Sequence, residues 1–216
     1  MKDFEDLGFG MFVHWGLYSQ LGVGEWTYLI HKRDMNAYKL LKDSFTAEDF
    51  CAEELVLTAK RAGCRYITLT TPHHEVFSLY DTCGLNDFDA PHSPAKRDLV
   101  REFVDACNKH GIVPIFYHTT LDWYNPDFNN DFDAYLEYLR KRVELLCKNY
   151  GKIGGLWFDG NWSKRDADWK EDELYARSVN ISRMLLLSTT QDLRKEESWA
   201  IPRLTRLPSS RADLRL

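Results

Sequence analysis

The sequence lacks the signatures of several protein classes. None of its five cysteines forms a CxxC pair or another metal-ligand spacing, which excludes a zinc ribbon and a dithiol redox motif. No stretch approaches the roughly 20 apolar residues of a membrane span. The first residues hold no apolar run of signal-peptide length. We therefore expect free buried thiols, a cytoplasmic protein and no membrane partner.

Positive charge is also scarce. The formal net charge is −5 at pH 7, which argues against nucleic acid as the main partner. Aromatic residues, by contrast, are abundant, with seven Trp, eleven Tyr and twelve Phe among 216 residues. One explanation is a heavy hydrophobic core. The other is a cleft lined with flat rings, which suits sugars.

The order of apolar runs and helical patterns predicts the fold class. Short apolar runs that are typical of buried parallel strands lie at 9–14, 66–70, 112–117 and 154–159. Helical patterns follow them at 46–62, 93–110, 131–150 and near Asp172. Strands that alternate with helices imply a parallel α/β sheet. We expect a partial (β/α)8 TIM barrel of about the first four to five β/α units, with residues 1–176 as its N-terminal half.

Capping signals set the expected helix boundaries. Thr46, with Asp49 three residues later, approximates a capping box and predicts a helix start. Ser93 followed by Pro94 predicts another start, because proline favours the first helical position. The expected helix ends carry glycine, at Gly63, Gly111 and Gly151.

The strand ends carry the residues with chemical potential. These are His14 with Trp15, His73 with His74, Tyr117 with His118, and Asp159. In parallel α/β folds the carboxyl ends of the strands are where ligands bind. Asp159 ends the apolar run 154–158, and packing explains a carboxylate there poorly. We interpret Asp159 as a nucleophile or general base, with a structural cap as the alternative.

Three functions fit these residues. The histidines His14, His73, His74 and His118 with Asp159 could bind a metal in a barrel hydrolase or sugar isomerase. The first strand, however, lacks the HxH pair of such barrels. A glycosidase needs two carboxylates, with rings and histidines that grip the sugar, and the aromatic content favours it. A non-catalytic carbohydrate-binding protein is the third possibility.

Several motifs together resemble one known family. They lie at 9–19, 24–26, 69–77, 97–100, 116–123 and 156–160. In this order and spacing, over about residues 4–176, they are similar to the first half of glycoside hydrolase family 29, the α-L-fucosidases. Two departures are Glu75, where that family usually has Asp, and Pro72, where a basic residue is common.

The resemblance implies a retaining exo-α-L-fucosidase without a metal or other cofactor, acting on a fucosylated glycan. Asp159 matches the nucleophile. The residues that match positions around the fucose hydroxyls and methyl group are His14, Glu25, Trp26, His73, His74, Tyr117 and Trp157. The acid/base carboxylate is not identifiable in this sequence.

The resemblance stops after Ala176, where the composition changes. Residues 177–216 hold eight Lys or Arg and four Asp or Glu. When the third base of each codon is chosen freely, a reading frame two bases later gives a segment with the apolar run AIVVN, similar to the family's continuation. We therefore expect an aberrant, out-of-frame tail and a truncated chain that is weakly active or inactive. We also expect a strand near 184–188 beside 156–158, and possible homo-oligomers through exposed barrel edges.

Overall fold

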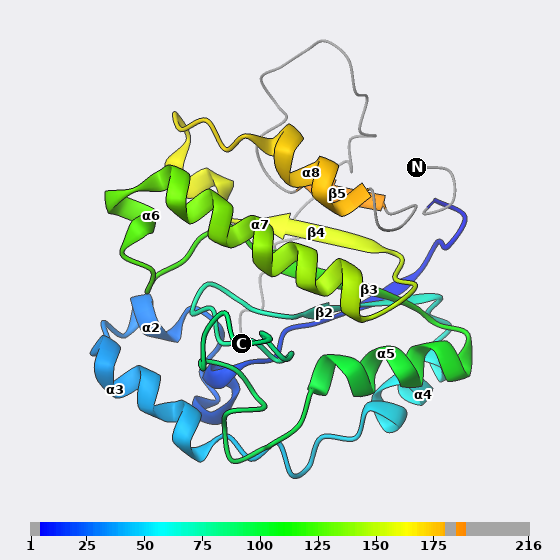
Figure 1. Ribbon diagram of the computed structural model, residues 1–216. Coiled ribbons are helices and arrows are strands. Elements are labelled where there is room, and N and C mark those ends of the chain that lie inside the picture. Colours follow the sequence, from blue (N-terminus) through cyan, green and yellow to red (C-terminus); the bar gives the residue numbers. More distant parts are fainter. Residues whose placement is uncertain (1–4, 180–184, 189–216) are drawn as a thin grey trace, which may run out of the picture.

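The computed structural model describes residues 5–179 and 185–188. The rest of the expected out-of-frame tail, 180–184 and 189–216, lies outside the described residues. Five parallel strands form one sheet in the order β1-β2-β3-β4-β5 (Figure 1). The strands are β1 (Gly10–Val13), β2 (Tyr66–Thr70), β3 (Val113–Thr119), β4 (Gly155–Asp159) and β5 (Leu185–Ser188). The predicted parallel α/β sheet is confirmed.

Each crossover in this sheet advances by one strand in the same direction. A doubly wound sheet would instead reverse direction at a switch point. β5 pairs with β4, and Leu186 lies opposite Leu156. We expected a strand near 184–188 at this position, beside residues 156–158. All five strands therefore follow chain order, and consecutive β/α units are neighbours in space.

Helices connect the strands, and shorter helical turns lie in the loops that follow them. The connecting helices are α4 (Ala52–Arg61), α5 (Leu99–His110), α7 (Phe132–Asn149) and α8 (Glu171–Val179). The loop elements are η1 (Leu17–Leu21), α2 (Thr27–Ile30), α3 (Met35–Lys39), η2 (Leu40–Ser44), α6 (Asp127–Asn130) and η3 (Asn161–Lys164). In Figure 1, α2, α3 and α6 lie on the side toward which the β4 arrow points, beyond the carboxyl ends of the strands. In the part of the chain described, no helix is long and apolar enough to cross a membrane.

The two faces of the sheet have different surroundings. Side chains alternate between faces along a strand, and one set, Ile67, Leu69, Phe116, Leu156 and Phe158, joins the main core with the helices.

The opposite face carries aromatic rings that converge. The Phe12 ring lies 5.9 Å from the Tyr117 ring and 5.5 Å from the Trp157 ring. Since β1 and β4 are three strand spacings of about 4.8 Å apart, rings that meet across them indicate a sheet curved around this face.

The predicted start of the first long helix at Thr46 is wrong, because the helix begins at Ala52. Arg97 donates from its two terminal nitrogens to the carbonyl oxygens of Ala47, at 2.8 Å, and Phe50, at 3.0 Å. Ala47 also has a φ of 48°, which a helix does not allow. The segment before α4 is thus held in a loop by a distant arginine.

The predicted start at Ser93 is also wrong, because α5 begins at Leu99. Ser93 Oγ donates to the carbonyl oxygen of Ala90 at 2.7 Å, and Lys96 has a φ of 52°, so the chain cannot continue as a helix there. Asp98 is the cap, since its Oδ1 accepts from the Arg101 amide at 2.9 Å.

The other predicted boundaries agree better with the structure. Gly111, with a φ of 70°, ends α5 as predicted. The helix expected over 131–150 is α7, whose cap is Asp131. The helix expected near Asp172 is α8.

Two aspartate caps allow a stability prediction. Asp98 caps α5 and its Oδ2 also accepts from the Tyr150 hydroxyl at 2.6 Å, which ties α5 to the end of α7. Asp131 caps α7 alone, through the Ala134 amide at 3.1 Å. We expect Asp98→Ala to lower the free energy of unfolding by about 2 kcal/mol and Asp131→Ala by about 1 kcal/mol. Urea unfolding measures both, and equal losses would contradict the added role of Tyr150.

Candidate active site

Asp159 lies at the carboxyl end of β4 and is reachable from solvent, with its side chain 25% exposed. Its Oδ2 accepts a hydrogen bond from the Tyr117 hydroxyl at 3.0 Å, and its Oδ1 accepts one from Trp162 Nε1 at 3.1 Å. One donor on each oxygen fixes the orientation of the carboxylate. Hydrogen bonds to ionised groups are the stronger ones, so this arrangement suits a charged Asp159.

Gly160 allows the chain to turn directly after this carboxylate. Its φ is 121°, and a Cβ there would lie 2.5 Å from the Leu121 amide nitrogen. The loop after β3 comes this close because the Thr120 amide donates to the Asp159 carbonyl oxygen at 2.6 Å. Glycine at position 160 is therefore required by both conformation and space.

Tyr117 is the donor in its bond with Asp159. Burial raises the pKa of the Tyr117 hydroxyl above its ordinary value, and the charge of Asp159 raises it further. The phenol keeps its proton throughout the physiological range, so it donates to the carboxylate and does not compete for charge.

His74 has a defined tautomer, which follows from its hydrogen bonds. Its Nδ1 lies 2.6 Å from Thr119 Oγ1, and that hydroxyl donates onward to the Leu121 carbonyl oxygen at 2.7 Å. The threonine must therefore accept from His74, which places the imidazole proton on Nδ1. Burial, followed by the neighbouring His73 and His14, lowers the pKa of His74 to about 2.

The other nitrogen of His74 faces the carboxylate. His74 Nε2 lies 3.9 Å from Asp159 Oδ2 and has no hydrogen-bond partner among the described residues. In the neutral tautomer Nε2 is an acceptor, so it cannot donate to Asp159. It is a buried acceptor next to the carboxylate.

His14 and His73 complete the histidine group. Their rings lie 5.7 Å apart, and the His73 ring stacks beside Tyr117 at 5.7 Å with an angle of 12°. His14 keeps an exposed surface, yet desolvation by the groups around it and the charge of His73 lower its pKa. Glu25 and Asp159 act in the opposite direction on the same pKa, which links Glu25 to this cluster.

Three tryptophans from three different loops form a wall beside the carboxylate. The Trp26 ring lies 5.9 Å from Trp123, 5.8 Å from Trp162 and 5.1 Å from the His74 ring. Flat rings next to a few convergent polar groups are the usual lining of a small-ligand site.

The structure brings together most of the residues that the sequence predicts for the site. His14, Trp26, His73, His74 and Tyr117 surround Asp159, through the contacts given above. Trp157 lies on the same face of β4, where its ring contacts Phe12.

His118 does not belong to this group, although it ends a strand run in the sequence. It follows Tyr117 on β3 and so faces the helices, where it is fully buried. Burial and the charge of Arg142 hold its pKa well below the ordinary value. Our interpretation of His118 as a strand-end functional residue is therefore wrong.

Two residues of the site were missed in the sequence. Thr119 fixes His74, and Trp162 binds Asp159. Trp162 follows Asp159 by three residues, and the η3 turn folds it back onto the carboxylate. A tryptophan one turn after the strand-end acid was the available signal.

The described part of the chain has no set of side chains that matches the metal-binding alternative. Across residues 5–179 and 185–188, no group of three or more His, Cys, Asp or Glu side chains is arranged to hold a metal ion.

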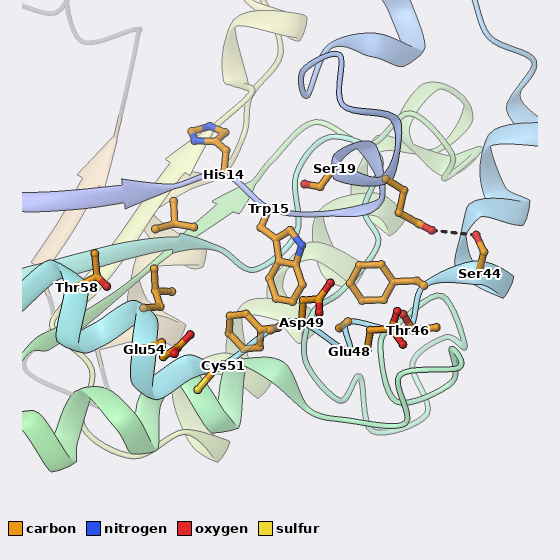
Figure 2. Close-up of a pocket in the computed structure, with 16 residues that line it drawn as sticks. His14, Trp15, Ser19, Ser44, Thr46, Glu48, Asp49, Cys51, Glu54 and Thr58 are labelled. Atoms are coloured by element: carbon orange, nitrogen blue, oxygen red, sulfur yellow. Dashed lines mark hydrogen bonds between the residues drawn. The ribbon is translucent and has the colours of Figure 1, made fainter.

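A separate hollow lies on the other side of the chain that leaves β1. It has a volume of about 690 Å³ and is lined by residues of α4 and of the preceding loop. Figure 2 shows His14 and Trp15 pointing to opposite sides, with Trp15 inside this hollow. Trp15 stacks on Phe50 there at 4.4 Å. Of the group around Asp159, the residue that also lines the hollow is His14.

Comparison with known proteins points to one family. A family model described as alpha-L-fucosidase matches residues 1–200. The match extends beyond Ala176, where we expected the resemblance to stop. A tissue alpha-L-fucosidase of Macaca fascicularis is 31% identical over 202 residues, which cover 83% of this chain and 43% of that protein. The human tissue alpha-L-fucosidase is 30% identical over 201 residues, covering 83% and 43%.

A solved structure agrees with these sequences. Alpha-L-fucosidase isoenzyme 1 from Paenibacillus thiaminolyticus superposes with a TM-score of 0.74 at 33% identity, covering 82% of this chain and 47% of that one. The chain thus spans less than half the length of these three relatives.

The neutral state of His74 predicts a pH dependence of stability. With its pKa lowered from 6.5 to about 2, the folded chain leaves His74 unprotonated where the unfolded chain binds a proton. Stability therefore falls as the pH drops below 6.5, by up to about 1.4 kcal/mol per pH unit from this residue. We expect His74→Gln to flatten the slope of the free energy of unfolding between pH 6.5 and 5. The exposed His31 supplies the control His31→Gln, and equal slopes in the two variants would contradict the prediction.

Proposed function

From the premise that this chain belongs to the alpha-L-fucosidase family, we propose that the protein hydrolyses terminal α-L-fucose from a glycan. The observation that carries the proposal is the solvent-reachable Asp159, whose two oxygens each accept one hydrogen bond. These bonds orient the carboxylate and leave lone pairs on both oxygens for attack.

We propose a retaining mechanism with Asp159 as the nucleophile. One carboxylate oxygen bonds to the anomeric carbon while the glycosidic carbon–oxygen bond breaks, and the leaving oxygen takes up a proton. Water then cleaves the glycosyl ester and releases fucose with Asp159 restored. We assign no acid/base carboxyl group among the described residues.

The surrounding residues are proposed to hold the sugar. His74 Nε2, an unpartnered acceptor 3.9 Å from Asp159 Oδ2, is suited to accept from a fucose hydroxyl. Residues with related binding roles are His14, Glu25, Trp26, His73, Tyr117 and Trp157. The tryptophan wall around Trp26 offers flat faces to the methyl group and ring carbons of the sugar.

We further propose that the sheet is the first part of a (β/α)8 barrel. Its sequential strand order and the contact between Phe12 and Trp157 across two intervening strands support this proposal. At the β1 edge Phe9 is 61% exposed and Phe12 is 40% exposed. Such an apolar edge favours association, so self-association through β1 is part of the proposal.

An aryl fucoside tests the nucleophile. Nitrophenol leaves without proton donation, so 4-nitrophenyl α-L-fucoside requires only nucleophilic attack in the first step. We expect the chain to release nitrophenol, Asp159→Ala to abolish release, and Asp166→Ala, at an exposed position on the following loop, to leave it unchanged.

The outcomes of this assay are distinct. Release that persists in Asp159→Ala would contradict the nucleophile. If no variant releases nitrophenol while L-fucose still binds, the chain is a fucose-binding protein and not a hydrolase. An α-configured first product, observed by proton NMR, is expected for retention, and a β-configured product would contradict it.

Trp162 yields a second kinetic prediction. Trp162→Phe keeps a ring in the wall but removes the donor to Asp159 Oδ1. We expect kcat to fall about tenfold or more with little change in KM, because a hydrogen bond to a charged group is lost. Trp123→Phe is the matched control in the same wall, and an equal loss of kcat in both variants would argue against a role for the indole N–H.

A further inference from the structure

Glu75 is a fully buried carboxyl group that the proposed mechanism does not use. Its exposure is 0%, and neither of its oxygens has a hydrogen-bond partner among the described residues. It also makes no ion pair with lysine or arginine in that part of the chain; the contact within ion-pair range is with His73. A buried carboxyl group without partners is costly, so a reason for its presence is needed.

His73 provides that reason. Its Nδ1 lies 3.6 Å from Glu75 Oε2, both side chains are almost fully buried, and Nδ1 likewise has no hydrogen-bond partner in the described residues. The distance is slightly longer than a hydrogen bond. The Glu75 oxygens lack a donor, and His73 Nδ1 could supply one. A small rotation of either side chain would satisfy one atom of each.

The backbone holds these two side chains on one side of a tight turn. The Val76 amide donates to the His73 carbonyl oxygen at 2.8 Å, and Val76 has a φ of 55°. Gly16 closes over the carboxyl group, since a Cβ there would lie 2.6 Å from Glu75 Oε1. The pairing is therefore built into the loops after β1 and β2.

The other groups near Glu75 cannot neutralise it. Burial and the charge of Glu75 raise the pKa of the Tyr18 and Tyr38 hydroxyls, so both phenols stay protonated. The Tyr124 hydroxyl is affected in the same direction and is also buried without a partner among the described residues. These neutral groups leave the His73 imidazole as the basic group in contact with the carboxyl group.

We propose that Glu75 is a positioning residue that holds the His73 imidazole with a proton on Nδ1, leaving Nε2 as an acceptor for the sugar. The second part of this inference rests on the proposed function. Thr119 imposes the same tautomer on His74. Adjacent histidines would then present two acceptors of one kind, one fixed from the loop after β2 and the other from the end of β3. The opposite arrangement, a protonated Glu75 that donates to Nδ1, would place the His73 proton on Nε2.

Nitrogen NMR of the sugar-free chain distinguishes these arrangements. A long-range proton–nitrogen spectrum of the chain labelled with 15N-histidine reports the protonation of each imidazole nitrogen. The seven histidines are separated by comparison with His73→Gln and His74→Gln. We expect a proton on Nδ1 of His73 at neutral pH, and a bare Nδ1 would overturn the proposal.

Substitutions of Glu75 test whether this residue sets the tautomer of His73. In Glu75→Leu, which removes the acceptor, the His73 proton should move to Nε2 while His74, held by Thr119, keeps its proton on Nδ1. Glu75→Asp should keep the His73 proton on Nδ1. If the His73 proton stays on Nδ1 in Glu75→Leu, the proposal is overturned. A general structural defect would move the His74 proton as well. If Glu75→Leu does not fold, the wild-type spectrum still decides.

Titration of the same wild-type sample with L-fucose tests the proposed function separately. We expect the His73 and His74 signals to shift with added fucose. If they do not shift while Nδ1 of His73 carries its proton, the fucosidase proposal fails and the positioning role of Glu75 stands.

Discussion

The register between β3 and β4 is the constraint on which the site depends. It places Thr119 opposite Asp159 and Tyr117 opposite Trp157. The Tyr117 hydroxyl then reaches diagonally to the carboxylate, and Thr119 holds His74 next to it. A slip of one residue would turn Asp159 toward the helices, because side chains alternate with a period of two. The buried apolar face of both strands prevents such a slip, so packing on one face fixes the chemistry on the other.

Burial gives the site its electrostatic character. The histidines are crowded against one another and against aromatic rings, and desolvation lowers the pKa of His14 and His74. His14 and His74 are therefore neutral next to a carboxylate that stays reachable from solvent. A neutral imidazole with its proton turned away offers a lone pair, which suits hydroxyl groups better than charged ligands.

The sequence predicted the strands well because their signal is local. Apolar runs mark the first four strands, and Asp159 stands out because it is a carboxylate at the end of such a run. The starts of α4 and α5 were mispredicted because side chains bind backbone carbonyl oxygens at the expected helix starts. Arg97, distant in the sequence, binds those of Ala47 and Phe50, and Ser93 binds that of Ala90. His118 was misassigned because adjacent residues at a strand end face opposite sides, which needs the register to decide. Trp162 was missed because its contact depends on a turn of η3, which no periodicity signals.

The sequential strand order explains how these parts form one continuous site. Adjacent units contribute adjacent parts. β1 is followed by His14 and Trp26 and β2 by the histidine pair, whereas Tyr117 and Thr119 lie in β3 and Asp159 ends β4. Tyr117 on a strand and Trp162 on a loop together fix the carboxylate, and rings on the loops after three of these strands build the wall. In a doubly wound sheet the strand order reverses, and the same residues would lie on both sides of the point of reversal. A curved, singly wound sheet instead gathers them on one concave face, so Asp159 and the residues around it form a unit within four consecutive strands.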